Sequence, residues 1–162
     1  MATLSKILFP SYPGSLAGSI LLLATRLIFG ATFMTHGLQK WANIEELSKT
    51  FPNPLGLGSE VSLALVLFAE LICPVAVIIG FLHRLALIPM IITMSIAFFV
   101  IHGADPFALR ELSLLYLALF ILLLFAGPGR LSIDSLIGRS INKRNRASAF
   151  GYHSGSGLDY SR

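Results

Sequence analysis

Residues 59–82 read SEVSLALVLFAELICPVAVIIGFL, and Glu60 and Glu70 are the only charged residues among them. A helix rises about 1.5 Å per residue, so about 20 mainly apolar residues cross the hydrocarbon core of a bilayer. Strands of a membrane barrel would alternate polar and apolar residues, and this stretch does not. Residues 59–82 therefore predict a membrane-spanning helix with one carboxylate, that of Glu70, near its middle.

Three further stretches have the length and composition of membrane spans. They lie at about residues 15–35, 85–101 and 109–126. Arg26 is the only charge in the first, and the second has none. The third is apolar after residue 111 and stops at Gly-Pro-Gly, a sequence that ends helices. We therefore predict an all-α integral membrane protein, a four-helix transmembrane bundle that forms one domain over residues 15–138.

The composition agrees with a membrane protein. Hydrophobic residues make up 55% of the 162 residues and charged residues 12%, against about 25% charged in a soluble domain. Lys and Arg outnumber Asp and Glu by 12 to 8, but they gather near the C-terminus rather than along an aromatic face. We expect these basic side chains to meet the lipid bilayer, and we expect no nucleic-acid partner.

The distribution of Lys and Arg predicts the orientation. With four spans, both termini share a side with the turn between the second and third spans. That side holds eight of the 12 Lys and Arg residues and the opposite loops hold three, the twelfth being Arg26. Because cytoplasmic loops carry the excess, both termini are expected in the cytoplasm, with the protein in a bacterial inner membrane. Residues 1–14 form a leader suited to the membrane interface, and residues 139–162 predict a basic, then Gly/Ser-rich, disordered tail.

Two charges lie deep in the predicted spans. An unpaired charge there costs about 2.5–3.5 kcal/mol on insertion scales. Arg26 lies ten residues before His36, and Glu70 lies eleven residues after Ser59, which places both about 15 Å below the outer surface. Opposite charges at one depth predict an Arg26–Glu70 pair that faces the bundle interior. The pair either fixes the helix register or contributes to a ligand or proton site. Pro74 removes the hydrogen bond to the Glu70 carbonyl and leaves that acceptor free.

Further polar and aromatic side chains gather in the predicted outer half of the bundle. Spacings of four, three, four and three place Arg26, Gly30, Phe33, Gly37 and Lys40 on one stripe of the first span. The candidates for a ligand or proton site are Arg26, His36, Lys40, Glu70, His102 and Glu111. The candidates for the pocket lining are Phe33, Phe98 and Phe99. Their spacing fits no metal motif, and the sequence assigns no catalytic residue.

Taken together, these residues resemble the DoxX family of small four-span membrane proteins. The resemblance extends from about Leu22 to Asp134. It rests on Arg26, Gly30, Phe33, His36-Gly37 and Lys40, then Phe68-Ala-Glu70, Gly80 and Arg84, then His102 and the exit Gly129-Arg-Leu-Ser-Ile-Asp134. It implies a subunit of a membrane oxidoreductase system, such as a quinone-reducing thiosulfate dehydrogenase, rather than a self-contained enzyme.

Two classes of function follow. The first is a redox-associated subunit that holds a quinone-like or other amphipathic small molecule between its helices. The sequence contains no motif for a redox centre, so electrons would come from a protein partner, and a homo-oligomer is also possible. The alternative is a non-enzymatic membrane scaffold or chaperone-like protein whose buried ion pair is structural. A transporter is a weaker third class because the four spans show no internal repeat.

Overall fold

Four spans that are long and apolar enough to cross a membrane make up most of the structure, a computed structural model that describes residues 15–154. The first is α2 (Leu16–Ala42), and the second consists of α4 (Ser59–Leu67), η1 (Phe68–Ile72) and α5 (Cys73–Ile79). The third consists of α6 (His83–Ile96) and η2 (Ala97–Ile101), and the fourth is α7 (Phe107–Ala126). All regular elements of the described residues are helices, which confirms the predicted fold class.

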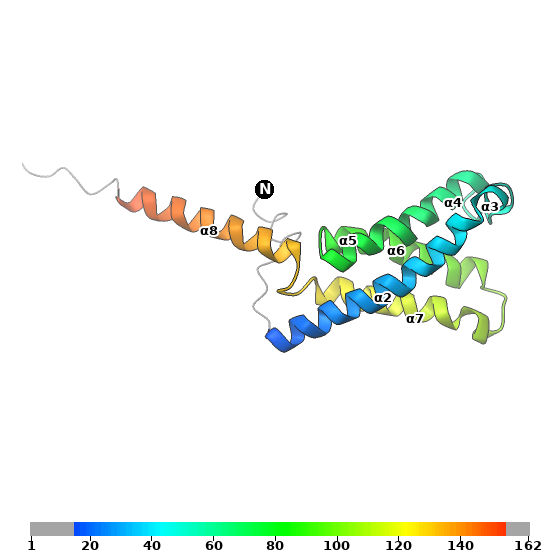
Figure 1. The fold of residues 1–162 in the computed structure, drawn as a ribbon, viewed down its shortest axis with the longest axis horizontal. Coiled ribbons are helices and arrows are strands. Elements are labelled where there is room, and N and C mark those ends of the chain that lie inside the picture. The colour runs from blue at the N-terminus through cyan, green and yellow to red at the C-terminus, as the bar shows by residue number, and fades with distance from the viewer. Residues whose placement is uncertain (1–14, 155–162) are drawn as a thin grey trace, which may run out of the picture.

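The spans lie side by side in alternating directions, so the bundle has two ends (Figure 1). We call one of them the loop end. It carries the short helix α3 (Ile44–Thr50) and the connections at residues 51–58 and 102–106. The other is the terminal end, which carries the start of α2, the turn at residues 80–82 and the linker at residues 127–132. The last helix, α8 (Ile133–Ser154), projects from the terminal end.

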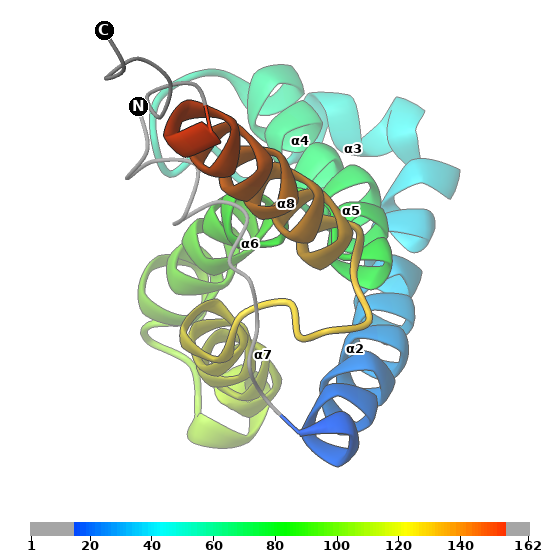
Figure 2. The same cartoon turned by 90° about the vertical axis from the view of Figure 1, so that its left-hand side faces the viewer.

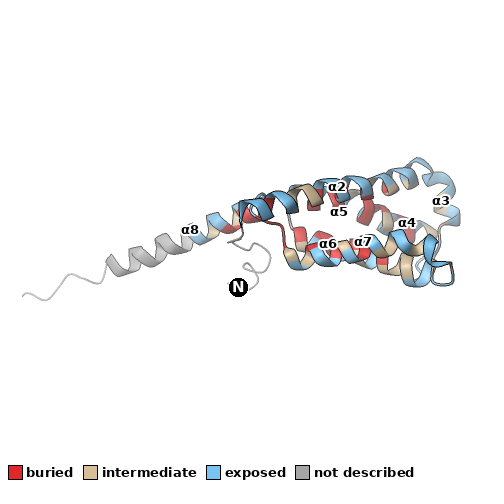
Figure 3. Cartoon of the chain, turned by 90° about the horizontal axis from the view of Figure 1, so that it is seen from below, coloured by how far each residue is buried: buried red, intermediate tan, exposed pale blue. Residues whose placement is uncertain are grey.

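The burial pattern is that of a small bundle in lipid. Buried residues face the inside of the bundle, and exposed residues cover its outside (Figure 3). Most of the outward side chains are large and apolar, as a helix surface in contact with lipid requires. The core forms where α5, α6 and α7 meet Phe33 of α2, around the buried side chains of Leu87, Met90 and Phe120.

The predicted stripe on α2 is the buried face of that helix. Arg26, Gly30, Phe33 and Gly37 are all buried. A Cβ atom on Gly30 would stand 2.6 Å from Cγ1 of Ile78, and one on Gly37 would stand 2.7 Å from Cδ2 of Leu71. These distances are too short for a side chain, so the two glycines let α2 pack closely against α5 and η1.

The second span contains a turn of π-helix at its middle, and the third contains one at its loop end. In η1, the amide of Cys73 donates to the carbonyl of Phe68, five residues earlier. Pro74 follows directly and has no N–H, so the predicted break in the hydrogen-bond ladder appears as a widened turn rather than as a sharp kink. In η2, the amide of His102 donates to the carbonyl of Ala97 over 2.9 Å. Each π-turn inserts one residue relative to a regular helix. Glu70 lies within η1, and His102 directly follows η2.

The linker at residues 127–132 crosses the terminal end of the bundle between α7 and α5 (Figure 2). It leaves α7 through Gly127 and Gly129, whose positive φ angles of 77° and 75° suit glycine. Asp134 then accepts hydrogen bonds of 2.9 Å from the backbone amides of Leu82 and His83. A carboxylate from a distant part of the chain therefore caps the N-terminus of α6, where a negative charge is favoured.

The described residues include part of one predicted terminal segment. Residues 139–162 were predicted to be disordered, but α8 continues to Ser154. Ser132 accepts a 3.1 Å hydrogen bond from the amide of Ser135, as an N-cap residue does, and so starts a helix that hydropathy does not reveal. Residues 155–162 and the predicted interfacial leader, residues 1–14, lie outside the described residues.

Candidate functional site

The predicted pair between Arg26 and Glu70 is wrong. A Cβ atom on Gly37 would stand 2.9 Å from Cβ of Glu70, so these two positions face each other. Arg26 lies eleven residues, about 16 Å, further along α2 toward the terminal end. The depth argument assumed that the first span ends at His36. The helix α2 instead continues to Ala42, six residues further, which accounts for about half of this eleven-residue offset.

Arg26 belongs to a buried polar cluster at the terminal end. Its side chain is fully buried, and Nη2 donates to the carbonyl of Leu131 over 2.5 Å. Nη1 donates to the carbonyl of Val77 over 3.5 Å. The negative charge of Asp134 acts on the same guanidinium. These contacts join α2, α5 and the linker, so Arg26 connects the elements of the terminal end and does not contribute to a site with Glu70.

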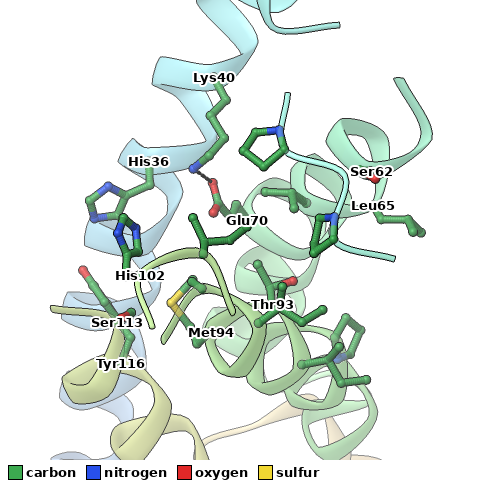
Figure 4. A pocket seen from close by; sticks show the side chains of 18 of the residues that line it. His36, Lys40, Ser62, Leu65, Glu70, Thr93, Met94, His102, Ser113 and Tyr116 are labelled. Carbon is green, nitrogen blue, oxygen red and sulfur yellow. Dashed lines mark hydrogen bonds and ion pairs between the residues drawn. The ribbon is translucent and has the colours of Figure 1, made fainter. Parts of the chain in front are cut away.

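The partner of Glu70 is Lys40. The ammonium Nζ of Lys40 lies 2.6 Å from Oε2 of Glu70, in a charge-assisted hydrogen bond (Figure 4). The Glu70 side chain is 3% exposed and that of Lys40 is 28% exposed. The pair therefore joins α2 to η1 at the border between the apolar interior and the loop end.

This ion pair faces a cavity of about 640 Å³ in the half of the bundle nearer the loop end. Small-molecule sites commonly have about 300–1,000 Å³. Helices α2, α4, η1, α6, η2 and α7 contribute to the wall, and Phe51, Pro52, Pro54 and Leu55 lie at the loop end. Five of the nine sequence candidates line the cavity: Phe33, His36, Lys40, Glu70 and His102. Most of the remaining lining is apolar. The side chains of His36, Lys40, Glu70 and His102 are therefore among the few polar groups that can orient a ligand.

An aromatic group forms the α2–α7 side of the cavity. The ring of Phe33 lies 5.1 Å from that of Tyr116 and 4.9 Å from that of Phe120, measured between centroids. The imidazole of His36 meets Tyr116 edge to face at 5.9 Å. Figure 4 shows His36, His102 and Tyr116 on one side of the cavity and the Lys40–Glu70 pair beside them. His102 is also tied to its own loop, because its Nδ1 lies 2.8 Å from Oδ2 of Asp105.

Four of the sequence candidates are not part of the cavity lining. Arg26 belongs to the terminal end, and Glu111 is exposed in the first turns of α7. Phe99 is exposed as well, and Phe98 lies beneath the guanidinium of Arg110, 5.3 Å from its ring centroid. Both phenylalanines belong to η2, and neither lines the cavity.

The sequence interpretation missed several polar side chains in the lining. They are Ser62, Thr93, Ser113 and Tyr116. Tyr116 had a usable signal, because it is a phenol within an otherwise apolar span and three residues from Ser113 on the same helix face. Of the described residues, no group of three or more His, Cys, Asp or Glu side chains is placed to hold a metal ion.

Comparison with known proteins gives a family and two similar proteins. The DoxX family profile matches residues 21–103. A Haemophilus influenzae protein described as uncharacterized is 28% identical over an alignment of 130 residues that covers 75% of this chain and 86% of that protein. A Mycobacterium tuberculosis protein described as the uncharacterized membrane protein Rv3486 is 29% identical over an alignment of 157 residues that covers 85% of this chain and 93% of that protein. No solved structure matches this chain significantly.

Proposed function

Because this chain belongs to the DoxX family of small multi-span membrane proteins, we propose that its cavity holds a quinone-like amphipathic molecule, as a redox-associated subunit of a membrane complex. The observation that carries the proposal is the Lys40–Glu70 pair on the wall of an apolar cavity of about 640 Å³. The redox part rests on the family resemblance, and the binding part rests on the geometry of the cavity.

The residues of the cavity fit the headgroup of a quinone. Its two carbonyl oxygens need hydrogen-bond donors, and the lining provides the Lys40 ammonium, the Tyr116 hydroxyl and the imidazoles of His36 and His102. The flat ring needs apolar and aromatic walls, which Phe33 and Tyr116 supply on one side. A bound quinone would take up two electrons, from a partner protein that carries a redox centre, and two protons.

Glu70 and Lys40 would have defined roles toward such a molecule. The Lys40 ammonium can donate to a carbonyl oxygen without leaving Glu70, since an ammonium has three N–H donors. The Glu70 carboxylate keeps that ammonium in place on the cavity wall, and it is the nearly buried member of the pair. In addition, a carboxyl group next to the headgroup can accept or return a proton.

A titration with a tail-less, water-soluble quinone tests the proposal. Calorimetry on the detergent-purified protein should show saturable binding to the wild type and at least about tenfold weaker binding to Glu70→Gln and Lys40→Met. Glu111→Gln is the matched control, because Glu111 is exposed and does not line the cavity. Absence of binding to the wild type, or equal binding to all four proteins, would mean that the ion pair is only structural, as in a membrane scaffold.

The proposal includes an orientation. Both termini and the terminal end would lie in the cytoplasm, and the cavity would lie in the outer half of a bacterial inner membrane. The Lys and Arg distribution supports this, with eight such residues on the terminal side and three on the loop side.

A further inference from the structure

The cavity has a polar side and an apolar side that belong to different helices. His36 and Lys40 come from α2, Glu70 from η1 and Tyr116 from α7, and His102 comes from the connection at residues 102–106. The lining from α4, the start of η1 and α6 is mainly hydrocarbon, with the small hydroxyls of Ser62 and Thr93 as exceptions. The apolar members on that side are Leu65, Val66, Phe68, Pro89, Ile92 and Ile96. Figure 4 shows Leu65 and Thr93 across the cavity from His36 and Tyr116.

Two of the directions that lead out of the cavity are closed. Between α2 and α7, the rings of Phe33, Tyr116 and Phe120 pack against one another in tilted and edge-to-face contacts, and Phe33 is only 1% exposed. Toward the terminal end, the fully buried side chains of Leu87 and Met90 belong to the packed core. A chain attached to a bound headgroup therefore cannot continue in either direction without displacing core side chains.

The apolar side is open where η1 meets α6. Phe68 and Ile92 line the cavity, yet they are 49% and 52% exposed. Ile92 lies ten residues before His102, so this opening is about 15 Å from the loop end, near the middle of the membrane. Leu65, one turn before Phe68, also lines the cavity and is 51% exposed, on the same side. Leu109 and Leu112 are further exposed lining residues, but these lie in the first two turns of α7, close to the loop end.

We propose that the opening between Phe68 and Ile92 is a lateral portal, through which the hydrocarbon chain of a prenylated quinone extends into the bilayer while its headgroup contacts Lys40 and Glu70. This inference rests on the proposed function and specifies it, because it names a lipid-soluble ligand that enters from the membrane. Both portal residues belong to membrane-spanning helices, so the chain passes from lipid to an apolar groove without entering water. Entry through the loop end would instead draw the chain past the charged side chain of Lys40.

Photochemical cross-linking locates the chain directly. The probe is a prenylated quinone with a diazirine on its first isoprene unit, added to the full-length protein in lipid nanodiscs. Peptide mass spectrometry should find the label on η1 and α6, at or next to Phe68 and Ile92, and an excess of the tail-less quinone should abolish it. Labelling of Leu109 and Leu112, or of the loop at residues 51–55, would overturn the portal.

Closing the portal provides a second test. Ile92→Trp places a larger side chain in the opening, and it should weaken binding of the prenylated quinone by about tenfold or more. Binding of the tail-less quinone should stay within about twofold of the wild type, since the headgroup site is untouched. Ile88→Trp is the matched control: Ile88 is an exposed residue of α6, one turn away, and does not line the cavity.

The outcomes separate the two proposals. If the tail-less quinone binds the wild type but Ile92→Trp and Ile88→Trp bind the prenylated quinone equally well, the portal is wrong and the headgroup site remains. If neither quinone binds the wild type, both proposals are wrong. Displacement of the label by phospholipid but not by the tail-less quinone would assign the groove to a bilayer lipid and would likewise overturn the portal.

Discussion

Replacement of Asp134 by alanine is expected to destabilise the folded protein by about 3–5 kcal/mol. The Asp134 side chain is almost fully buried and accepts 2.9 Å hydrogen bonds from the amides of Leu82 and His83. A hydrogen bond to a charged group contributes about 1.5–3 kcal/mol, and such contributions are not fully additive. The substitution also leaves the buried guanidinium of Arg26 without the opposite charge that acts on it.

The magnitude is large for a domain of this size, because folded proteins are stable by only about 5–15 kcal/mol. Asp134→Asn should fall between the wild type and Asp134→Ala, since an amide oxygen can still accept one of the two hydrogen bonds. Asp105→Ala is the matched control. The Asp105 carboxylate also has a hydrogen-bond partner, the imidazole of His102, but the Asp105 side chain is 41% exposed. Loss of this carboxylate should therefore cost less than about 1 kcal/mol.

Unfolding in mixed detergent micelles, followed by circular dichroism as the fraction of denaturing detergent rises, measures these differences. The reasoning is refuted if Asp134→Ala is within about 1 kcal/mol of the wild type or of Asp105→Ala. Such a result would mean that the α6 terminus finds other acceptors and that Arg26 does not depend on Asp134.

Three further predictions follow from the structure. In the same unfolding assay, Lys40→Met and Glu70→Gln should show a coupling energy of about 0.5–3 kcal/mol. The effects of Arg26→Met and Glu70→Gln should be additive, because these two residues are far apart. The reverse pattern would support the Arg26–Glu70 pair instead. Gly37→Ala should cost about 1–3 kcal/mol, because its Cβ would stand 2.7 Å from Cδ2 of Leu71, whereas Gly18→Ala at an exposed position, where the Cβ would meet only Oγ of Ser15 at 3.2 Å, should cost less than about 1 kcal/mol. In a Cys73→Ser background, an impermeant thiol reagent on intact cells should label Glu46→Cys at the loop end but not Asn142→Cys in α8; labelling of position 142 alone would invert the proposed orientation.

The spans themselves were predictable because hydropathy depends on residue type and not on neighbours in space. Four apolar stretches, the helix-ending Gly-Pro-Gly and the stripe through Gly30 and Phe33 all appear in the structure. The stripe also carries Lys40, so the sequence contained the residue that pairs with Glu70. What it lacked was a reason to choose Lys40 over Arg26, since both have the same charge and lie on the same face of one helix.

Whether Lys40 or Arg26 pairs with Glu70 depends on the axial register between α2 and the second span. Hydropathy marks where apolar residues end, but α2 continues as a helix to Ala42, which accounts for about half of the eleven-residue offset from the predicted pairing. The register is set by the close contacts of Gly30 with Ile78 and of Gly37 with Leu71, which exist only when both helices are packed. Likewise, Phe98 and Phe99 lie in the π-turn η2 and do not line the cavity, and the extra residue of a π-turn does not appear in a pattern of regular helical period.

The amino-acid sequence by itself determined that this protein crosses a membrane four times, because about 20 consecutive apolar residues are stable only out of water. It also determined which face of α2 is buried, because helical periodicity is a local property. Only the tertiary structure decided which charges meet and which side chains enclose the cavity. Those contacts join residues 30 or more positions apart, and their distances depend on helix length, π-turns and glycine contacts that act together.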